Sequence, residues 1–405
     1  MTAASDTACP SSLDTRSLIL PEIVFGVGSM ASLPAKLKRL SEGPALIVSD
    51  RGVAQAGLLE QVRAQLEAAS IPVAVFDRVE ADPCIESVEA CVEFAKDCQA
   101  KVLIGLGGGS PLDVTKITSF LSVTPGRVSD FFGMEKVPRK GIPMILIPTT
   151  AGTGTEMAIG AVVSDTQNRL KKGILSQYML CEVAILDPRL TVSCPPSVTA
   201  ATGIDALTHA IEVFTNKRAV LFIDQIVLVA IRLLLQNIRR AYERPEDLEA
   251  RSAMLLGSMY AGIGMQVINN AAVHAMSSPF GAMYEVPHGL ANALLLPAVM
   301  EYNTPVCEHK YAQIVDVCSL ADCRMPVRDK AELAIKHIKE TIKELHIPSQ
   351  LECFRIRRSD IPVMAELSMR VWLMANNPRP MGVGDAAAVY ERAFASHRIP
   401  IEAMT

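Results

Sequence analysis

The sequence has no concentrated run of positive charge. Its formal net charge is −4 over 405 residues, and no cluster of lysine and arginine with interleaved aromatic side chains occurs in it. A protein that binds nucleic acid needs a basic surface to meet the phosphate backbone. The composition therefore argues against a nucleic-acid partner.

Closely spaced pairs of cysteine are also missing. The chain has 10 cysteines, but none form a Cys-x-x-Cys motif. Cys84, Cys91 and Cys98 recur every seven residues, a spacing typical of one helix face and not of a metal cage. We interpret the cysteines as reduced, mostly packing thiols and expect a cytoplasmic protein.

Long hydrophobic runs that would suit a membrane are lacking as well. The first 12 residues are polar, with neither the basic region nor the apolar region of a signal peptide. The most apolar internal stretch, 219–236, carries Asp224 and Arg232, which is typical of a buried helix. We expect no membrane location.

Two domains are predicted from length and pattern. A chain of 405 residues, half of them hydrophobic, can bury a large core. Before the Pro-rich segment 191–197, short apolar strands alternate with helical patterns, which predicts an α/β domain with a parallel sheet. After it, nearly everything has helical periodicity. We predict an α/β domain over 1–193, with 1–15 as a flexible tail, and an all-α domain over 194–405. The five predicted strands are 46–49, 73–76, 102–106, 144–147 and 183–186.

A glycine-rich turn follows the third of these strands. The turn and the residues after it contain, in order, Gly107, Gly108, Gly109, Ser110, Pro111 and Asp113. Glycines let a ligand approach the backbone, Ser110 suits a helix N-cap and Pro111 the first helical position. The free N–H groups and the helix dipole would then favour a pyrophosphate. The motif is not Gly-x-Gly-x-x-Gly, and a purely structural glycine turn is the alternative.

Two further strand ends carry polar residues. The strand 143–148 runs into a loop of hydroxyls and glycines, 149–156, which suits a polar ligand or caps the next helix. The strand 45–50 ends on Asp50, where a carboxylate would hold the ribose hydroxyls of a dinucleotide. Asp50 also suits the N-cap of the helix-like stretch that follows.

One carboxylate and three imidazoles lie in apolar segments of the helical half. Asp205 and His209 are four residues apart, so both side chains leave the same helix face. His274 and His288 lie in two further helical segments, and each could add one ligand. These ingredients indicate a metal site, while the alternative is a set of core histidines, each with one hydrogen bond. The other four histidines, in charged or surface-like surroundings, are His309, His337, His346 and His397.

These motifs, in this order, resemble the group III, iron-dependent alcohol dehydrogenases. The resemblance covers nearly the whole chain after the first dozen or so residues. It rests on segments 20–28, 107–113, 148–156, 187–188, 203–212, 274–289 and 377–379. It implies a Rossmann-like cofactor domain beside a helical metal domain, in the architecture of dehydroquinate synthase.

The resemblance also implies site residues. Asp205, His209, His274 and His288 would bind a catalytic divalent metal, Fe2+ or sometimes Zn2+. Gly108, Gly109 and Ser110, with Gly107 before them, would hold the pyrophosphate of NAD. The other cofactor contacts it implies are Asp113, Thr149, Thr150, Thr153 and Lys172. Asp50 would favour NAD over NADP, because a 2′-phosphate would meet like charge there.

The chain departs from the family at a few positions. Many members carry a histidine four residues after the third metal ligand, where this chain has Ser278, so a relay through that histidine is lost and Ser278 or water could replace it. Asp82-Pro83 replaces a common Asn-Pro, and Cys181 stands where proline is common.

The resemblance implies a metal-dependent alcohol dehydrogenase or carbonyl reductase, with its active site between the domains. The metal would lower the pKa of the alcohol, and hydride would pass between the substrate and nicotinamide. We expect a small alcohol or aldehyde substrate and a homodimer or higher homo-oligomer. The alternatives are a maleylacetate-reductase-like or hydroxyacid reductase, a dehydroquinate-synthase-like lyase, and a non-catalytic binder with a structural metal. Gly160, Met265 and Asn270 are candidate pocket residues, and they do not identify the substrate.

Overall fold

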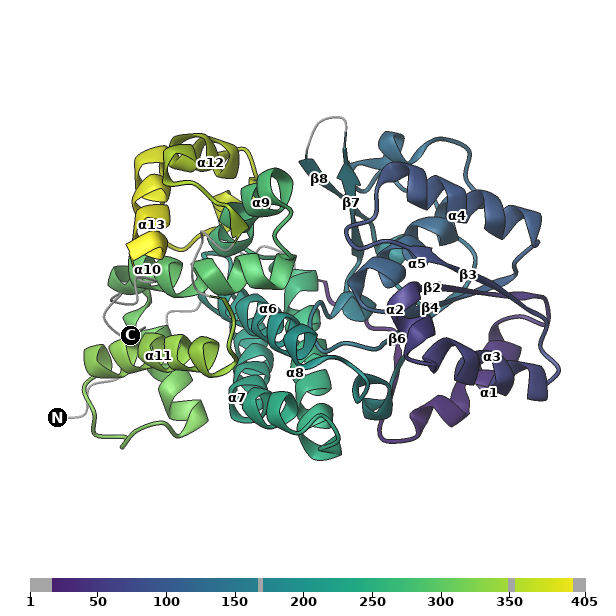
Figure 1. The fold of residues 1–405 in the computed structure, drawn as a ribbon, viewed down its shortest axis with the longest axis horizontal. Helices are drawn as coiled ribbons and strands as arrows, with labels where there is room; N and C mark the ends of the chain where they lie inside the picture. The colour runs from purple at the N-terminus through teal and green to yellow at the C-terminus, as the bar shows by residue number, and fades with distance from the viewer. Residues whose placement is uncertain (1–16, 167–169, 349–353, 396–405) are drawn as a thin grey trace, which may run out of the picture.

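The fold has a sheet half and a helical half that lie side by side (Figure 1). The computed structural model describes residues 17–166, 170–348 and 354–395. The predicted tail 1–15, His397 and two of the cysteines, Cys9 and Cys353, lie outside the described residues. The change from alternating strands and helices to helices alone confirms the predicted fold class.

All six strands of the main sheet are parallel. In spatial order they are β1 (Glu22–Phe25), β9 (Val183–Leu186), β6 (Met144–Pro148), β4 (Val102–Gly107), β2 (Ala45–Asp50) and β3 (Val73–Val79). The five predicted strands are confirmed, and the short edge strand β1 is additional. The three strands β4, β6 and β9 are buried along their whole length, as expected of parallel strands covered on both faces.

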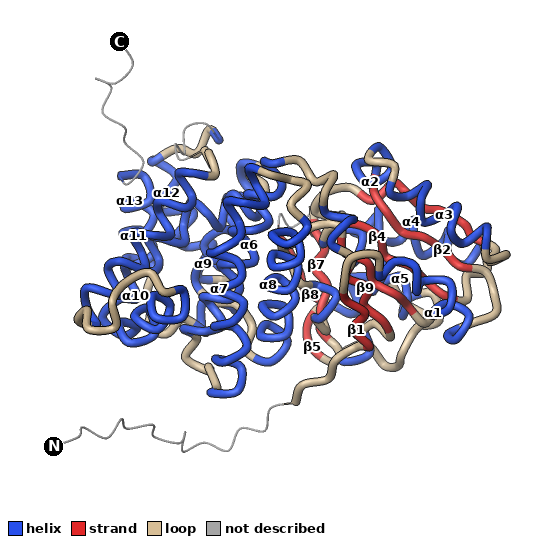
Figure 2. The backbone as a smooth tube through the Cα atoms, turned by 90° about the horizontal axis from the view of Figure 1, so that it is seen from below, coloured by secondary structure: helices blue, strands red, loops and turns tan. Residues whose placement is uncertain are grey.

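Helices cover both faces of this sheet (Figure 2). Alternate side chains of a strand point to opposite faces. Ile47 and Ile104 therefore pack in one core cluster, and Leu46 and Leu103 pack in another. The first cluster includes residues of α1 (Leu33–Leu40), α2 (Arg51–Gln55) and α3 (Leu58–Ala68), and the second includes residues of α4 (Ile85–Asp97) and α5 (Gly109–Leu121).

A second, smaller sheet was not predicted. It pairs β5 (Gly133–Met134) with β8 (Leu170–Leu175), and β8 with the antiparallel β7 (Gly160–Asp165). In Figure 1 the β7–β8 hairpin extends toward α9 (Ala272–Tyr284) of the helical half. This hairpin brings residues of the sheet half to the helices.

The helical half is a bundle around one large core. Besides α9, its α-helices are α6 (Pro196–Thr215), α7 (Leu221–Glu243), α8 (Leu248–Val267), α10 (His288–Cys318), α11 (Val327–Glu344), α12 (Ile361–Met369) and α13 (Val383–Ala395). By length and composition alone, α7 could cross a membrane. It packs instead against α6 and α8, and Ile223, Val227 and Ile231 are buried in the core.

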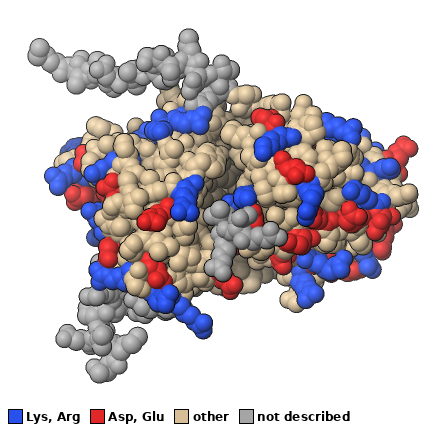
Figure 3. Space-filling view, turned by 90° about the horizontal axis from the view of Figure 1, so that it is seen from above, with Lys and Arg blue, Asp and Glu red and all other residues tan. Residues whose placement is uncertain are grey.

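The halves are joined through α8 and the loop after β6. Leu255, Met259 and Ile263 of α8 belong to the core cluster of the sheet half. Gly154, in the loop, has φ +57 and lies so close to Gly262 that a Cβ on it would come within 2.8 Å of the Gly262 Cα. A side chain at either glycine would push the halves apart. Figure 3 shows a hollow between the two halves.

Candidate active site

Three helices bring the four predicted metal ligands together. Asp205 and His209 lie one turn apart on α6, His274 is the third residue of α9, and His288 is the first residue of α10. The Asp205 Oδ1 atom lies 3.8 Å from the Nε2 atom of His209 and 3.7 Å from the Nε2 atoms of the other two histidines. One ligand atom from each of the four lies within 4.8 Å of all the others.

Three of the four candidate ligands are buried, and the fourth is partly exposed. Asp205, His209 and His274 are at most 7% exposed, whereas the side chain of His288 is 37% exposed. Burial lowers the pKa of His209 to about 4, and burial also lowers the pKa of His288. The rings of His209 and His288 are therefore neutral near pH 7 and offer nitrogen lone pairs.

This donor set fits a divalent transition metal. Three neutral imidazoles and one carboxylate suit iron or zinc. They also leave a net positive charge and room for a further group. Inside the protein, the converging lone pairs would repel each other unless a cation or a hydrogen-bond donor lies between them.

Glu212 supports the cluster from behind, and the sequence did not assign it a role. It lies on α6, three residues after His209, and is 4% exposed. Its carboxylate accepts hydrogen bonds from His274 Nδ1 at 2.5 Å, from the Val273 N–H at 2.5 Å and from the Ala271 N–H at 3.2 Å. The available signal was the spacing, because Asp205, His209 and Glu212 share one helix face.

Asn292 is a second residue that the sequence did not assign. It lies one turn after His288 on α10 and is fully buried. Its amide donates to the Asp205 carboxylate at 2.7 Å. The same nitrogen lies 3.2 Å from His274 Nε2 and 3.3 Å from His288 Nε2. One amide group therefore faces three of the four candidate ligands.

Ser278 lies one turn after His274 on α9 and is partly exposed. It lies on the same helix face as His274, and its role as a relay stays a prediction.

The predicted cofactor loop lies at the switch point of the sheet. From β2 the chain continues outward to β3 and then crosses back to β4 on the other side of β2. Ligands of open α/β sheets bind outside the carboxyl ends of the strands at such a point. Asp50 ends β2 and Gly107 ends β4. The Thr149 N–H, just after β6, donates to the Gly107 carbonyl at 2.9 Å.

Two glycines of this loop have no room for a side chain. Gly107 has φ +151, and a Cβ on it would lie 2.7 Å from Pro111 Cγ and 3.1 Å from Asp50 Oδ2. A Cβ on Gly109 would lie 2.7 Å from Thr153 Cγ2. The backbone of the loop is thus packed against Asp50 and Thr153, which are also predicted to contact the cofactor.

The start of α5 corrects one expectation. Gly108, and not Ser110, is the N-cap, and the helix begins at Gly109. Ser110 therefore lies inside the first turn, where its hydroxyl accepts a hydrogen bond from the Asp82 N–H at 3.2 Å. The free N–H groups of the first turn still face the loop.

Asp50 and Asp113 already have protein partners. Asp50 caps α2 by accepting from the Val53 N–H at 2.9 Å, so its reading as an N-cap is confirmed, and its other oxygen faces Gly107. Asp113 accepts from Thr155 Oγ1 at 2.6 Å and from the Val162 N–H at 2.9 Å. The side chain of Asp113 thus holds the neighbouring loop.

Lys172, a predicted cofactor contact, has two protein partners. It pairs with Asp165 at 2.7 Å and lies over the Phe132 ring. Its neighbour Lys171, on the opposite face of β8, pairs with Asp82 at 2.6 Å. A Cβ on Gly281 of α9 would lie 3.9 Å from the Lys171 Cε atom. Lys171 therefore approaches both a neighbour of the cofactor loop and a helix of the metal half.

The chain matches one family over both halves. The iron-containing alcohol dehydrogenase pattern matches residues 21–188, and the C-terminal pattern of the Fe-containing alcohol dehydrogenase family matches residues 199–394. A sulfoacetaldehyde reductase of Bilophila wadsworthia (strain 3_1_6) is 35% identical over 377 residues, which cover 92% of this chain and 97% of that protein.

Solved structures show the same fold. The crystal structure of a 1,3-propanediol oxidoreductase has a TM-score of 0.91 and 32% identity, and covers 94% of this chain and 100% of that one. The sulfoacetaldehyde reductase from Bifidobacterium kashiwanohense, solved in complex with NAD+, has a TM-score of 0.85 and 25% identity, with 94% and 99% covered. The chain therefore belongs to the iron-containing alcohol dehydrogenase family and is an oxidoreductase that acts on CH–OH groups.

Proposed function

We propose that this protein interconverts a small alcohol and its aldehyde or ketone with NAD(H), at a divalent metal held by Asp205, His209, His274 and His288. The observation that carries the proposal is the convergence of these four ligand atoms within 4.8 Å, beside the cofactor loop. Fe2+ is the metal we propose, with Zn2+ as the alternative, because both accept this donor set.

A bound divalent cation would supply a Lewis acid that lowers the pKa of the substrate hydroxyl. The chain supplies the rest. Asp205 contributes the one negative charge among the ligands, and the neutral rings of His209 and His288 leave the site positive. Ser278, on the open side, can pass the hydroxyl proton to water. The buried surroundings of the other ligands keep bulk water away from the reacting carbon.

On the sheet half, the N–H groups after Gly107 would hold the NAD pyrophosphate at the N-terminus of α5. Gly108, Gly109 and Ser110 supply this surface, and Thr149, Thr150 and Thr153 line it. The Asp50 oxygen that faces Gly107 would accept from a ribose hydroxyl.

Lys171 replaces Lys172 in this proposal. Its side chain pairs with Asp82, whose N–H donates to Ser110 of the phosphate loop. Its Cε lies toward Gly281 of α9, so it is the lysine that a nicotinamide-side ribose would meet. A bound cofactor would compete with Asp82 for the ammonium group. Lys172 then stabilises the β7–β8 hairpin through its ion pair with Asp165.

We also propose a cytoplasmic homo-oligomer. The eight cysteines among the described residues are all free, which suits a reducing compartment. The edge strand β1 leaves Phe25 39% exposed, and proteins commonly cover such edges.

A substrate screen tests the proposed reaction. Primary alcohols, secondary alcohols and acid-bearing alcohols would be offered with NAD or NADP, and the matching carbonyl compounds with the reduced cofactors. We expect NAD-linked turnover of a small neutral alcohol or aldehyde that needs added metal. Turnover of acid-bearing substrates alone would favour the hydroxyacid-reductase alternative, and no hydride transfer to any substrate would overturn the proposal.

A further inference from the structure

We infer that Glu212 is a positioning residue that fixes the His274 ring for metal binding, and that it acts from a buried place behind the metal cluster. The inference rests on the proposed metal site. It adds to the four proposed ligands a carboxylate, that of Glu212, which would contact neither substrate nor cofactor.

The hydrogen bond to Glu212 selects one form of the His274 ring. A carboxylate only accepts hydrogen bonds, so the 2.5 Å contact requires a proton on Nδ1. The Nε2 atom, which lies toward Asp205 at 3.7 Å, then carries the lone pair. A neutral imidazole has one such lone pair, and the opposite tautomer would turn an N–H toward the metal position.

Glu212 also fixes the helix that carries this ring. The N-cap of α9, Ala271, has no side-chain cap of its own. The Ala271 and Val273 N–H groups donate to Glu212 instead. The carboxylate of α6 thereby holds the first turn of α9 at the place where His274 leaves it.

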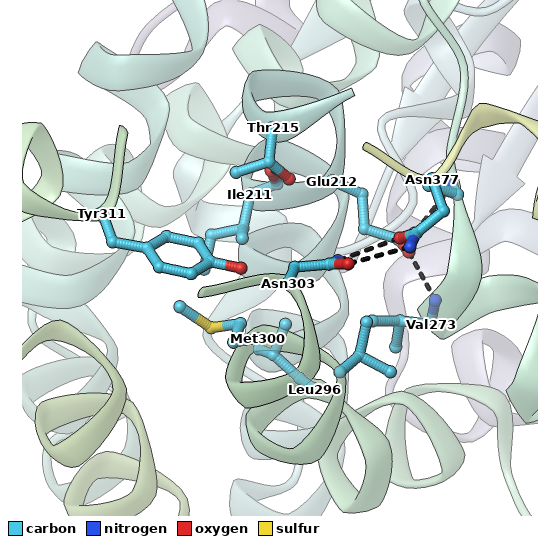
Figure 4. A pocket seen from close by; sticks show the side chains of 11 residues that line it. Ile211, Glu212, Thr215, Val273, Leu296, Met300, Asn303, Tyr311 and Asn377 are labelled. Atoms are coloured by element: carbon cyan, nitrogen blue, oxygen red, sulfur yellow. Dashed lines mark hydrogen bonds between the residues drawn. The ribbon is translucent and has the colours of Figure 1, made fainter. Parts of the chain in front are cut away.

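Behind the carboxylate lies a small cavity between α6, α9 and α10 (Figure 4). About 10 Å³ is open to the centre of a water molecule, close to the least that holds one ordered water. Asn303 and Asn377 exchange two hydrogen bonds on one side of it, at 2.9 and 2.8 Å. The cavity wall has no basic side chain. Among the described residues, no cationic side chain in this wall therefore competes with His274 for the charge of Glu212.

A double-mutant cycle on metal-depleted, full-length protein tests the inference. Zn2+ affinity is measured by chelator competition for wild type, Glu212→Gln, His274→Ala and the double variant. A glutamine of the same shape keeps one accepting oxygen but can direct its NH2 group at His274 and favour the wrong tautomer. We expect Glu212→Gln to weaken Zn2+ binding about tenfold to hundredfold, and by less than about twofold when His274 is already alanine.

Two further variants separate positioning from packing. Thr215→Val changes the same cavity from the same helix without touching His274, and should leave Zn2+ affinity unchanged. Glu212→Asp keeps the charge, and serves if the glutamine variant does not fold; its loss of affinity should also vanish without His274.

The outcomes are distinct. Equal losses in the wild-type and His274→Ala backgrounds would mean that Glu212 only supports the fold, and would overturn the inference. Unchanged affinity in folded Glu212→Gln would overturn it too. If wild type itself bound no metal, the proposed function would fail and not this inference alone.

Discussion

The two halves contribute different chemical groups to the site. The helical half uses side chains: four ligands on three helices, held by Glu212 and Asn292. The sheet half uses mainly backbone at the ends of strands, with glycines packed so closely that a Cβ would collide. The metal cluster should therefore lose function when one side chain is removed, whereas the cofactor loop should respond in graded steps.

The largest expected effect is at the metal cluster. His274→Ala removes one of four ligands, so metal content and turnover should fall together, turnover by more than about hundredfold. Metal per chain is measured by elemental analysis beside the rate of NADH formation. His309→Ala, an exposed histidine of α10, is the control and should change neither. A His274→Ala protein with normal metal and rate would remove this residue from the site.

The lysine pair on β8 gives a matched test of the cofactor side. Lys171→Met should raise the KM for NAD, by about tenfold if one charge-assisted contact is lost, because this side chain pairs with Asp82 beside the cofactor loop. Lys172→Met should leave that KM nearly unchanged, since its partner is Asp165. Steady-state kinetics with NAD as the varied substrate decide between them. The reverse result would restore Lys172 as the cofactor contact.

Asp50 tests the choice between NAD and NADP. Asp50→Asn removes the charge and keeps an N-cap for α2, so the specificity-constant ratio of NAD to NADP should fall by several-fold, up to about tenfold. Asp50→Gly should relax the preference in the same direction at a small cost in stability. If both ratios stay at the wild-type value, another group sets the preference.

The smallest effect is expected at Ser278. If the metal alone activates the alcohol, Ser278→Ala should slow turnover by less than about tenfold, against about hundredfold or more for a true general acid or base. Ser278→His should move the pH profile toward neutrality, where an imidazole titrates. Rates against pH are compared at saturating NAD. A collapse of Ser278→Ala with metal content intact would make the serine an obligatory relay.

The sequence predicted features that depend on local pattern. Central parallel strands such as β4 are apolar along their length, and the spacing of Asp205 and His209 follows from helix geometry, so both were visible. The edge strand β1 is short and half-buried, and β8 carries Lys171 and Lys172, so neither has the apolar run of a central strand.

Features that depend on packing between distant segments were missed or misplaced. Glu212 and Asn292 meet the ligands only when α6, α9 and α10 pack together, and a buried polar residue does not reveal its partner in sequence. The choice between Lys171 and Lys172 depends on the face of β8, which is known only once its register with β7 is known. The start of α5 differed by two residues, within the usual uncertainty of helix ends.

Metal removal and return tests the central claim most directly. The wild-type protein is stripped with a chelator, and Fe2+ or Zn2+ is then added in steps while bound metal and NADH formation from an accepted alcohol are followed. The account predicts that stripped protein is folded and inactive, and that activity returns in proportion to bound metal and saturates near one ion per cluster of Asp205, His209, His274 and His288. Full activity in folded protein without metal would contradict it.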